Sequence, residues 1–313
     1  MLGIAWTLLD IITFSLFSPF GTYQNLGVPI RAVNRAVAGV PRRDILGKML
    51  VEGLERYKYR LTIHNYSRIV DGEEIGAFDE LEVSKKSIII FNHVGGNDFV
   101  VNMQLLDYVN RLEDLRWVTL KAFENKITKP ALDAVDALLL TQKPEQDKIE
   151  IEKYAEKYRD PASTFAISVF PEGGILDKDT YKRCKRVMDK YIHYTFENMC
   201  TPFVGAVSQL FDAFPEADIF DVNLKYFDRY GSGHASQGDY IGDRYSVINV
   251  ALKARHPDEI FASIKKLERP ATGTDMTKWM NNLWREKEKT LKKMRDPRID
   301  EELRAAEEVS DTE

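Results

Sequence analysis

Cysteine is almost absent from the chain. Its 313 residues include two cysteines, Cys184 and Cys200. Two thiols are too few for a disulfide framework or for a metal site built from cysteine. We therefore expect a reducing compartment for the part of the protein that carries the chemistry. The chain also lacks an excess of basic residues, because its net charge is −5. A nucleic-acid-binding surface is not expected from such a balance.

The acidic excess comes from one end of the chain. Residues 299–313 hold seven acids and one base, a net charge of −6, which leaves +1 for residues 1–298. The body of the protein is therefore close to neutral. We interpret residues 299–313 as an acidic, disordered tail.

A long apolar segment opens the chain. Residues 2–20 contain no Lys or Arg and one charged side chain, Asp10. Their number is close to the ~20 residues that span a bilayer, although Asp10 near the middle would cost about 3 kcal/mol. A cleaved secretory signal is not expected, since a basic n-region and a small-residue cleavage site are both missing. The segment predicts a membrane-associated helix that spans the bilayer or lies in one leaflet, and a buried core helix is the alternative.

Basic residues follow the apolar segment: Arg31, Arg35, Arg42 and Arg43. If residues 2–20 span the membrane, the positive-inside rule places the rest of the chain in the cytoplasm.

Strand-like and helix-like patterns alternate along the chain from residue 44 onward. We predict strands near residues 60–66, 86–91, 116–120, 137–141, 164–170, 201–207, 218–226 and 245–253. We predict helices near residues 44–60, 98–110, 122–130, 145–159, 178–195 and 275–296. The Gly-rich segment 229–243 is expected to be a loop. This alternation indicates an α/β fold with a mostly parallel central sheet that helices cover on both faces.

The predicted helix 275–296 is amphipathic. Its apolar residues, which include Trp279 and Trp284, recur at helical spacing, and basic residues that include Lys287 are expected on the opposite side. Such a helix fits a membrane interface. It fits equally well a helix that docks on the core and exposes its basic side to solvent.

The first motif of chemical interest follows the apolar run 88–91. This run is of strand type and is followed by Asn92-His93, then Gly95-Gly96, then Asp98. A turn through the glycines can return the Asp98 carboxylate to one imidazole nitrogen and leave the other facing outward. This pairing is the base and orienting acid of a catalytic triad. Because no Ser or Cys lies in the stretch, the proton that His93 takes would come from a substrate hydroxyl.

A second motif ends another apolar strand. Phe170-Pro171-Glu172-Gly173-Gly174 stands at the end of the apolar strand predicted at 164–170. The carboxyl ends of parallel strands meet at one edge of the sheet, so both motifs should face one crevice. There Glu172 could accept a hydrogen bond from a substrate hydroxyl, and the glycine N–H groups could hold an anion.

The two motifs in this order resemble the two signature blocks of the glycerolipid acyltransferases, the lysophospholipid acyltransferase superfamily. The resemblance covers about residues 60–295. It also includes Leu120-Lys121 with Pro130, Gln237-Gly238-Asp239-Tyr240, and Trp279, Trp284, Glu286, Lys287 and Glu288. The last group is similar to a helix in the eukaryotic-type lysophosphatidate and lysocardiolipin acyltransferases. The chain then divides into an N-terminal membrane-associated region (1–58), an acyltransferase domain (59–298) and the tail (299–313).

The resemblance implies transfer of an acyl chain from acyl-CoA to the hydroxyl of a lysophospholipid. His93 would be the general base and Asp98 would fix its tautomer. N–H groups near Val94–Gly96 would be oxyanion donors. No metal or cofactor is implied beyond acyl-CoA as co-substrate, and the partners are lipid substrates and a membrane surface. The expected substrate-binding residues are Asn92, Lys121, Lys143, Phe170, Pro171, Glu172, Gly173 and Gly174.

Two positions depart from the family pattern. Gln142 stands where the family usually has an Arg that is thought to hold the acceptor phosphate, and Lys143 could replace it only as a point charge. Phe203 stands where a later Arg is usual. Both departures weaken the expectation of a phosphomonoester acceptor. They leave open a catalytically weak or inactive relative that binds membrane lipid. A hydrolase or metal site on His93, Asp98 and Glu172 is a third alternative.

Overall fold

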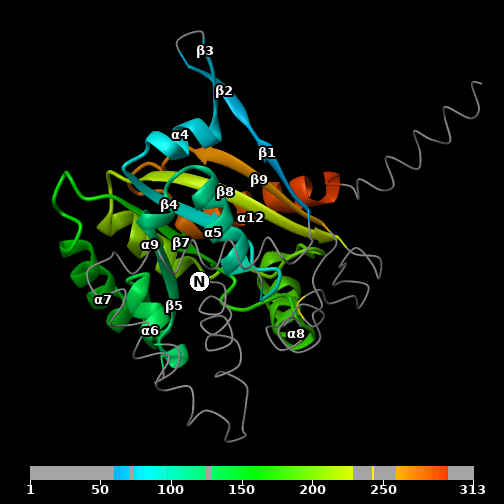
Figure 1. Cartoon of the computed structure of the whole chain (residues 1–313). Coiled ribbons are helices and arrows are strands. Elements are labelled where there is room, and N and C mark those ends of the chain that lie inside the picture. The colour runs from blue at the N-terminus through cyan, green and yellow to red at the C-terminus, as the bar shows by residue number, and fades with distance from the viewer. Residues whose placement is uncertain are drawn as a thin grey trace, which may run out of the picture.

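The computed structural model describes residues 60–70, 73–96, 98–124, 129–227, 242 and 259–294 (Figure 1). Several predictions concern residues outside these ranges: the apolar segment 2–20, most of the helix 44–60, nearly all of the loop 229–243, the strand 245–253 and the tail 299–313. Within the described part of the chain, no helix is both long and apolar enough to cross a bilayer.

A seven-stranded sheet forms the centre of the molecule, in the order β1-β9-β8-β4-β7-β5-β6. Its strands are β1 (Arg60–Asn65), β4 (Lys86–Phe91), β5 (Leu115–Leu120), β6 (Leu138–Leu140), β7 (Phe165–Val169), β8 (Asp218–Phe227) and β9 (Glu259–Leu267). All neighbouring strands are parallel except β8 and β9, which are antiparallel. The predicted α/β fold with a mostly parallel sheet is therefore confirmed.

The described helices pack around the sheet, and those before β9 lie between strands in the chain (Figure 1). They are α4 (Ala77–Val83), α5 (Asp98–Tyr108), α6 (Lys129–Ala134), α7 (Pro144–Glu156), α8 (Lys178–Val187), α9 (Val204–Ala213) and α12 (Met276–Lys293). Every residue of β4 and β7 is buried. Because successive side chains of a strand point to opposite faces, the centre of the sheet is covered on both faces, as a parallel sheet requires.

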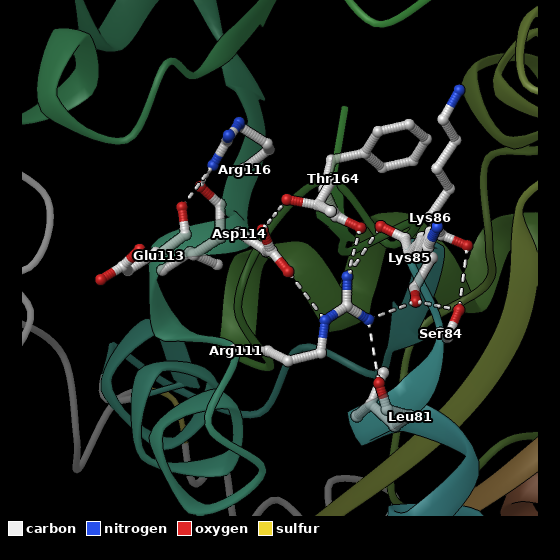
Figure 2. Close-up of polar contacts among 12 residues, drawn as sticks. Leu81, Ser84, Lys85, Lys86, Arg111, Glu113, Asp114, Arg116 and Thr164 are labelled. Atoms are coloured by element: carbon white, nitrogen blue, oxygen red, sulfur yellow. Dashed lines mark hydrogen bonds and ion pairs between the residues drawn. The ribbon is translucent and has the colours of Figure 1, made fainter. Parts of the chain in front are cut away.

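A buried arginine ties the amino ends of two central strands to the end of α5 (Figure 2). The Arg111 guanidinium donates hydrogen bonds to the carbonyl oxygens of Leu81, Lys85 and Phe165. It also donates to Asp114 at 2.8 Å. These bonds satisfy a charged group that is only 5 % exposed, and they fix where β4 and β7 begin.

Helix α12 docks on the core. Its buried residues are Met280, Trp284, Lys287, Glu288 and Leu291. The prediction that Lys287 belongs to a solvated basic side was wrong, because its ammonium group pairs with Asp221 at 2.6 Å and donates to the carbonyl oxygen of Val222 at 2.8 Å. Of the two alternatives for this helix, the structure supports docking on the core.

The predicted strand 201–207 was also wrong, because helix α9 begins at Val204. Val207, Leu210 and Phe211 are its buried residues, at the three- and four-residue spacing of a helix. The sequence-based assignment also missed the hairpin of β2 (Ser67–Val70) and β3 (Glu73–Gly76), the helix α4 and the strand β9. The predicted helix 178–195 ends as an α-helix at Val187 and continues as a π-turn over Met188–Ile192.

Candidate active site

His93 lies just beyond the carboxyl end of β4, in the turn that leads to α5. Its Nδ1 lies 2.7 Å from Oδ2 of Asp98, the first residue of that helix. Asp98 is fully buried, whereas 24 % of the His93 side chain is exposed. The turn through the glycines therefore brings the two side chains together as the sequence predicts.

Four groups donate to the two oxygens of the Asp98 carboxylate. Besides the imidazole, Oδ2 accepts from the N–H groups of Val94 at 2.6 Å and Gly95 at 3.1 Å. Oδ1 accepts from the hydroxyl of Tyr226, a residue of β8. An ionised carboxylate only accepts, so the proton of a neutral His93 lies on Nδ1 and the basic lone pair lies on Nε2. No described residue forms a hydrogen bond with Nε2.

The side chain of Phe170 holds the imidazole from one side. Its ring centre lies 4.6 Å from that of His93 and 5.2 Å from that of Phe91. Phe170 therefore fills the space between the end of β4 and the imidazole. Of the predicted substrate-binding residues, Phe170 is the one whose side chain packs against the base.

Glu172 connects the two motifs through the backbone. Its Oε1 accepts from the N–H of His93 at 3.1 Å, and its Oε2 accepts from the N–H of Cys200 at 2.8 Å. Glu172 is 1 % exposed. Burial raises the pKa of its carboxyl well above the usual range, and the two N–H groups oppose that shift. The structure thus gives both oxygens to backbone amides, whereas the sequence had suggested a contact with a substrate hydroxyl.

The N–H groups that the sequence suggested as oxyanion or anion donors are largely engaged. Those of Val94 and Gly95 donate to Asp98. That of Gly173 donates to the carbonyl oxygen of Phe170 at 3.1 Å, in a turn where Gly173 has a φ of 66°. These three amides serve the local turns, so they are not free to bind an oxyanion in this conformation.

Two further predicted binding residues are internal supports. The side chain of Asn92 is buried; its Nδ2 donates to the carbonyl oxygen of Leu224 at 2.9 Å, and its Oδ1 accepts from the N–H of Leu224 at 2.7 Å. This amide continues the pairing of β4 with β8 beyond Phe91. Pro171 is buried, and its carbonyl oxygen accepts from the N–H of Phe203 at 2.7 Å.

Lys121 and Lys143 lie at the same edge of the sheet as His93, because they follow the parallel strands β5 and β6. Both are exposed. Strands are spaced by about 4.8 Å, so the two lysines emerge roughly 10 Å and 14 Å along the sheet from the end of β4. That separation is within the reach of an extended substrate that has its reacting group at His93.

Gln142 and Phe203, the two departures from the family pattern, meet at Gly173. A Cβ atom added to Gly173 would lie 3.2 Å from the ring of Phe203 and 3.9 Å from Nε2 of Gln142. Both side chains are exposed. Gly174 is half-buried beside Thr180. A neutral amide and an aromatic ring therefore border the second motif where the resemblance suggested guanidinium groups.

Three residues that support the site were not predicted for that role: Tyr226, Cys200 and Trp284. The indole N–H of Trp284 donates to the carbonyl oxygen of Cys200 at 2.9 Å, and the N–H of Cys200 holds Glu172. Trp284 belongs to the group of residues that carry the family resemblance, so the sequence did offer a reason to expect a role for it. Tyr226 had no signal, because a tyrosine in an apolar strand is common and its partner lies 128 residues away.

A hollow lies away from this site, at the other edge of the sheet. Its volume is about 900 Å³, and Lys86, Tyr158 and Asp218 line it at the amino ends of β4 and β8. In the described part of the chain, no three His, Cys, Asp or Glu side chains are arranged to hold a metal ion.

No protein-family model matches the chain, and no curated protein matches it in sequence.

Proposed function

We propose that the protein is an acyl-CoA-dependent O-acyltransferase that moves a fatty acyl chain onto the hydroxyl of a lysophospholipid of the lysophosphatidate or lysocardiolipin type. One observation carries the proposal: Asp98 occupies Nδ1 of His93 and leaves Nε2 without a described partner on a partly exposed ring. The resemblance of the two motifs supplies the substrate class. The packing of Phe170 and the bonds of Glu172 support it by fixing the base.

In the proposed reaction, Nε2 of His93 accepts the hydroxyl proton as the oxygen attacks the thioester carbonyl of acyl-CoA. The tetrahedral intermediate then collapses, the carbon–sulfur bond breaks, and the CoA sulfur takes the proton from the imidazolium. The products are the phospholipid ester and CoA thiol. Asp98 stabilises the imidazolium that forms between these steps. General-base help of this kind contributes about 10²–10⁴-fold to the rate.

Charge and exposed apolar surface at the same sheet edge suit these substrates. Lys121 and Lys143 would attract the phosphates of CoA or of the acceptor. Phe123 is 57 % exposed and Phe203 is 63 % exposed. Phe123 follows strand β5, and the ring of Phe203 lies beside Gly173 of the second motif. Because the acceptor and the product are lipids, we place the reaction at a membrane surface, with residues 2–20 as the attachment and the catalytic domain on the cytoplasmic side.

The test is an acceptor screen with the purified full chain. Labelled acyl-CoA is supplied with lysophosphatidate, lysophosphatidylglycerol or monolysocardiolipin, and labelled lipid and free CoA are measured. His93→Ala should lower transfer about 10²–10⁴-fold. His193→Asn is the matched control, because His193 is exposed and has a φ of 51°, a conformation that Asn tolerates. A folded protein that acylates none of the three acceptors would contradict the proposal.

A lipid-binding protein with weak or no catalysis is the second candidate. It is favoured by one observation, that the N–H groups of Val94 and Gly95 are bound to Asp98 and are not free for an oxyanion. It predicts that lysolipid binding survives His93→Ala without any loss of function. The same variant therefore separates the two candidates.

A further inference from the structure

Helix α8 and the π-turn that continues it present a strongly basic surface. Thr180, Tyr181, Cys184 and Met188 face inward and are buried. The outward residues include six exposed bases and two exposed acids, a formal charge of +4. The bases are Lys178, Lys182, Arg183, Lys185, Arg186 and Lys190, and the acids are Asp179 and Asp189. We call these eight residues the α8 basic face.

The start of this helix is attached to the candidate active site. The N–H of Leu176, two residues before α8, donates to the carbonyl oxygen of Val94 in the His93 turn at 3.3 Å. The Asp177 carboxylate caps the helix by accepting from the N–H of Thr180 at 2.7 Å. The hydroxyl of Tyr181 donates to the carbonyl oxygen of Phe196 at 2.8 Å. These bonds attach the start of α8, the helix labelled in Figure 1, to the turn that carries His93.

Bases outnumber acids by six to two among these eight residues. Lys185 lies 3.5 Å from Asp189, and both side chains are more than half exposed, so the pair contributes little. Two apolar side chains lie among the bases: Tyr191 is 68 % exposed and Val187 is 39 % exposed. The ammonium of Lys190 lies 4.8 Å from the ring centre of Tyr191. Basic residues with an exposed aromatic ring are the composition of a helix that lies on an anionic membrane surface.

We propose that the α8 basic face binds the headgroups of anionic phospholipids and so turns the His93 edge of the sheet toward the bilayer. The charge alone selects a polyanion. The choice of a membrane over a nucleic acid rests on the proposed function, since lipid substrates reach His93 from a bilayer. The chain carries −5 in total, so this attraction is local to α8. Each base near an anionic membrane contributes about fivefold to binding.

The experiment measures flotation of the full chain with two kinds of vesicle, phosphatidylcholine alone and phosphatidylcholine mixed with phosphatidylglycerol. Residues 2–20 are present in every sample, so the comparison isolates the preference for anionic lipid. The test variant is Lys182→Glu with Arg186→Glu. The matched control is Lys148→Glu with Lys153→Glu, which makes the same charge change on exposed positions of α7. The preference for anionic over neutral vesicles should fall at least tenfold in the α8 variant and should stay unchanged in the control.

A milder variant, Lys182→Gln with Arg186→Gln, should lose a smaller part of the preference and guards against misfolding. Circular dichroism checks the fold of each variant. The proposal is overturned if the α8 and α7 variants lose the preference equally, if neither loses it, or if single-stranded RNA displaces the protein from vesicles through the same face. Binding needs no acyl transfer. His93→Ala should therefore bind both vesicles as the unmodified chain does, which separates a failure here from a failure of the proposed reaction.

Discussion

The hydroxyl of Tyr226 in β8 donates a hydrogen bond to Oδ1 of Asp98 at the start of α5. Both residues are fully buried. The other carboxylate oxygen serves His93, so the tyrosine holds the carboxylate in the orientation that the imidazole requires. Tyr226 is in this sense a positioning residue, and it acts on the proposed reaction only through Asp98.

Removing this hydroxyl should affect both stability and rate. Tyr226→Phe leaves Oδ1 of Asp98 buried without its partner, which should lower the free energy of unfolding by about 1–3 kcal/mol. We expect kcat for acyl transfer to fall while KM stays near its original value, because Tyr226 is fully buried and contacts Asp98. The control is Tyr108→Phe, at a side chain that is 70 % exposed. An unchanged kcat in Tyr226→Phe would contradict a positioning role for Tyr226.

Glu172 offers a test of whether it contacts backbone or substrate. In Glu172→Gln, one oxygen becomes an NH₂ group that faces a backbone N–H, so a hydrogen bond is lost and a buried donor is left unpaired. The free energy of unfolding should fall by about 1–3 kcal/mol and transfer should fall with it. Glu286→Gln, on the exposed side of α12, should change neither. Unchanged stability with a raised KM for the acceptor would instead indicate the substrate contact that the sequence suggested.

The buried pair of Lys287 and Asp221 predicts a large effect on stability. Lys287→Met removes a cation that is fully buried and leaves the Asp221 carboxylate unpaired in the core. Removing one partner of a buried pair costs about 3–5 kcal/mol, measurable by urea unfolding. The double variant Lys287→Met with Asp221→Asn should recover part of the loss. Lys289→Met, on an exposed lysine, should have little effect. If Lys287→Met were as stable as Lys289→Met, the buried ion pair between Lys287 and Asp221 would be contradicted.

The two cysteines should titrate very differently. A hydrogen bond from the Cys200 thiol lowers the pKa of Cys184 to about 6, and the same bond together with burial raises the pKa of Cys200. As pH rises through about 6, thiolate absorbance from one sulfur should therefore appear in the folded protein. Cys184→Ala should abolish that transition, and Cys200→Ala should move it toward the ordinary value of ~8.5. A folded protein without thiolate at neutral pH would refute the hydrogen bond between Cys184 and Cys200.

Local pattern in the sequence was enough to predict most of the central strands and the His93–Asp98 pair. The apolar run Ile88–Phe91 has the length and composition of a buried strand. His93 and Asp98 are five positions apart with two glycines between them, so one turn brings them together whatever the rest of the chain does. The short hairpin and α4 were missed because their segments are short and mixed in composition.

The roles of the surrounding residues were decided only by the tertiary structure. Lys287 and Glu288 look like solvated helix residues in the sequence, yet both are buried, because Asp221 and strand carbonyls receive the ammonium and backbone amides near Asn198 receive the carboxylate. Tyr226 and Cys200 reach the site from segments far from His93. A buried polar group is stable only where distant segments supply its partners, and no local pattern in the sequence records those distances.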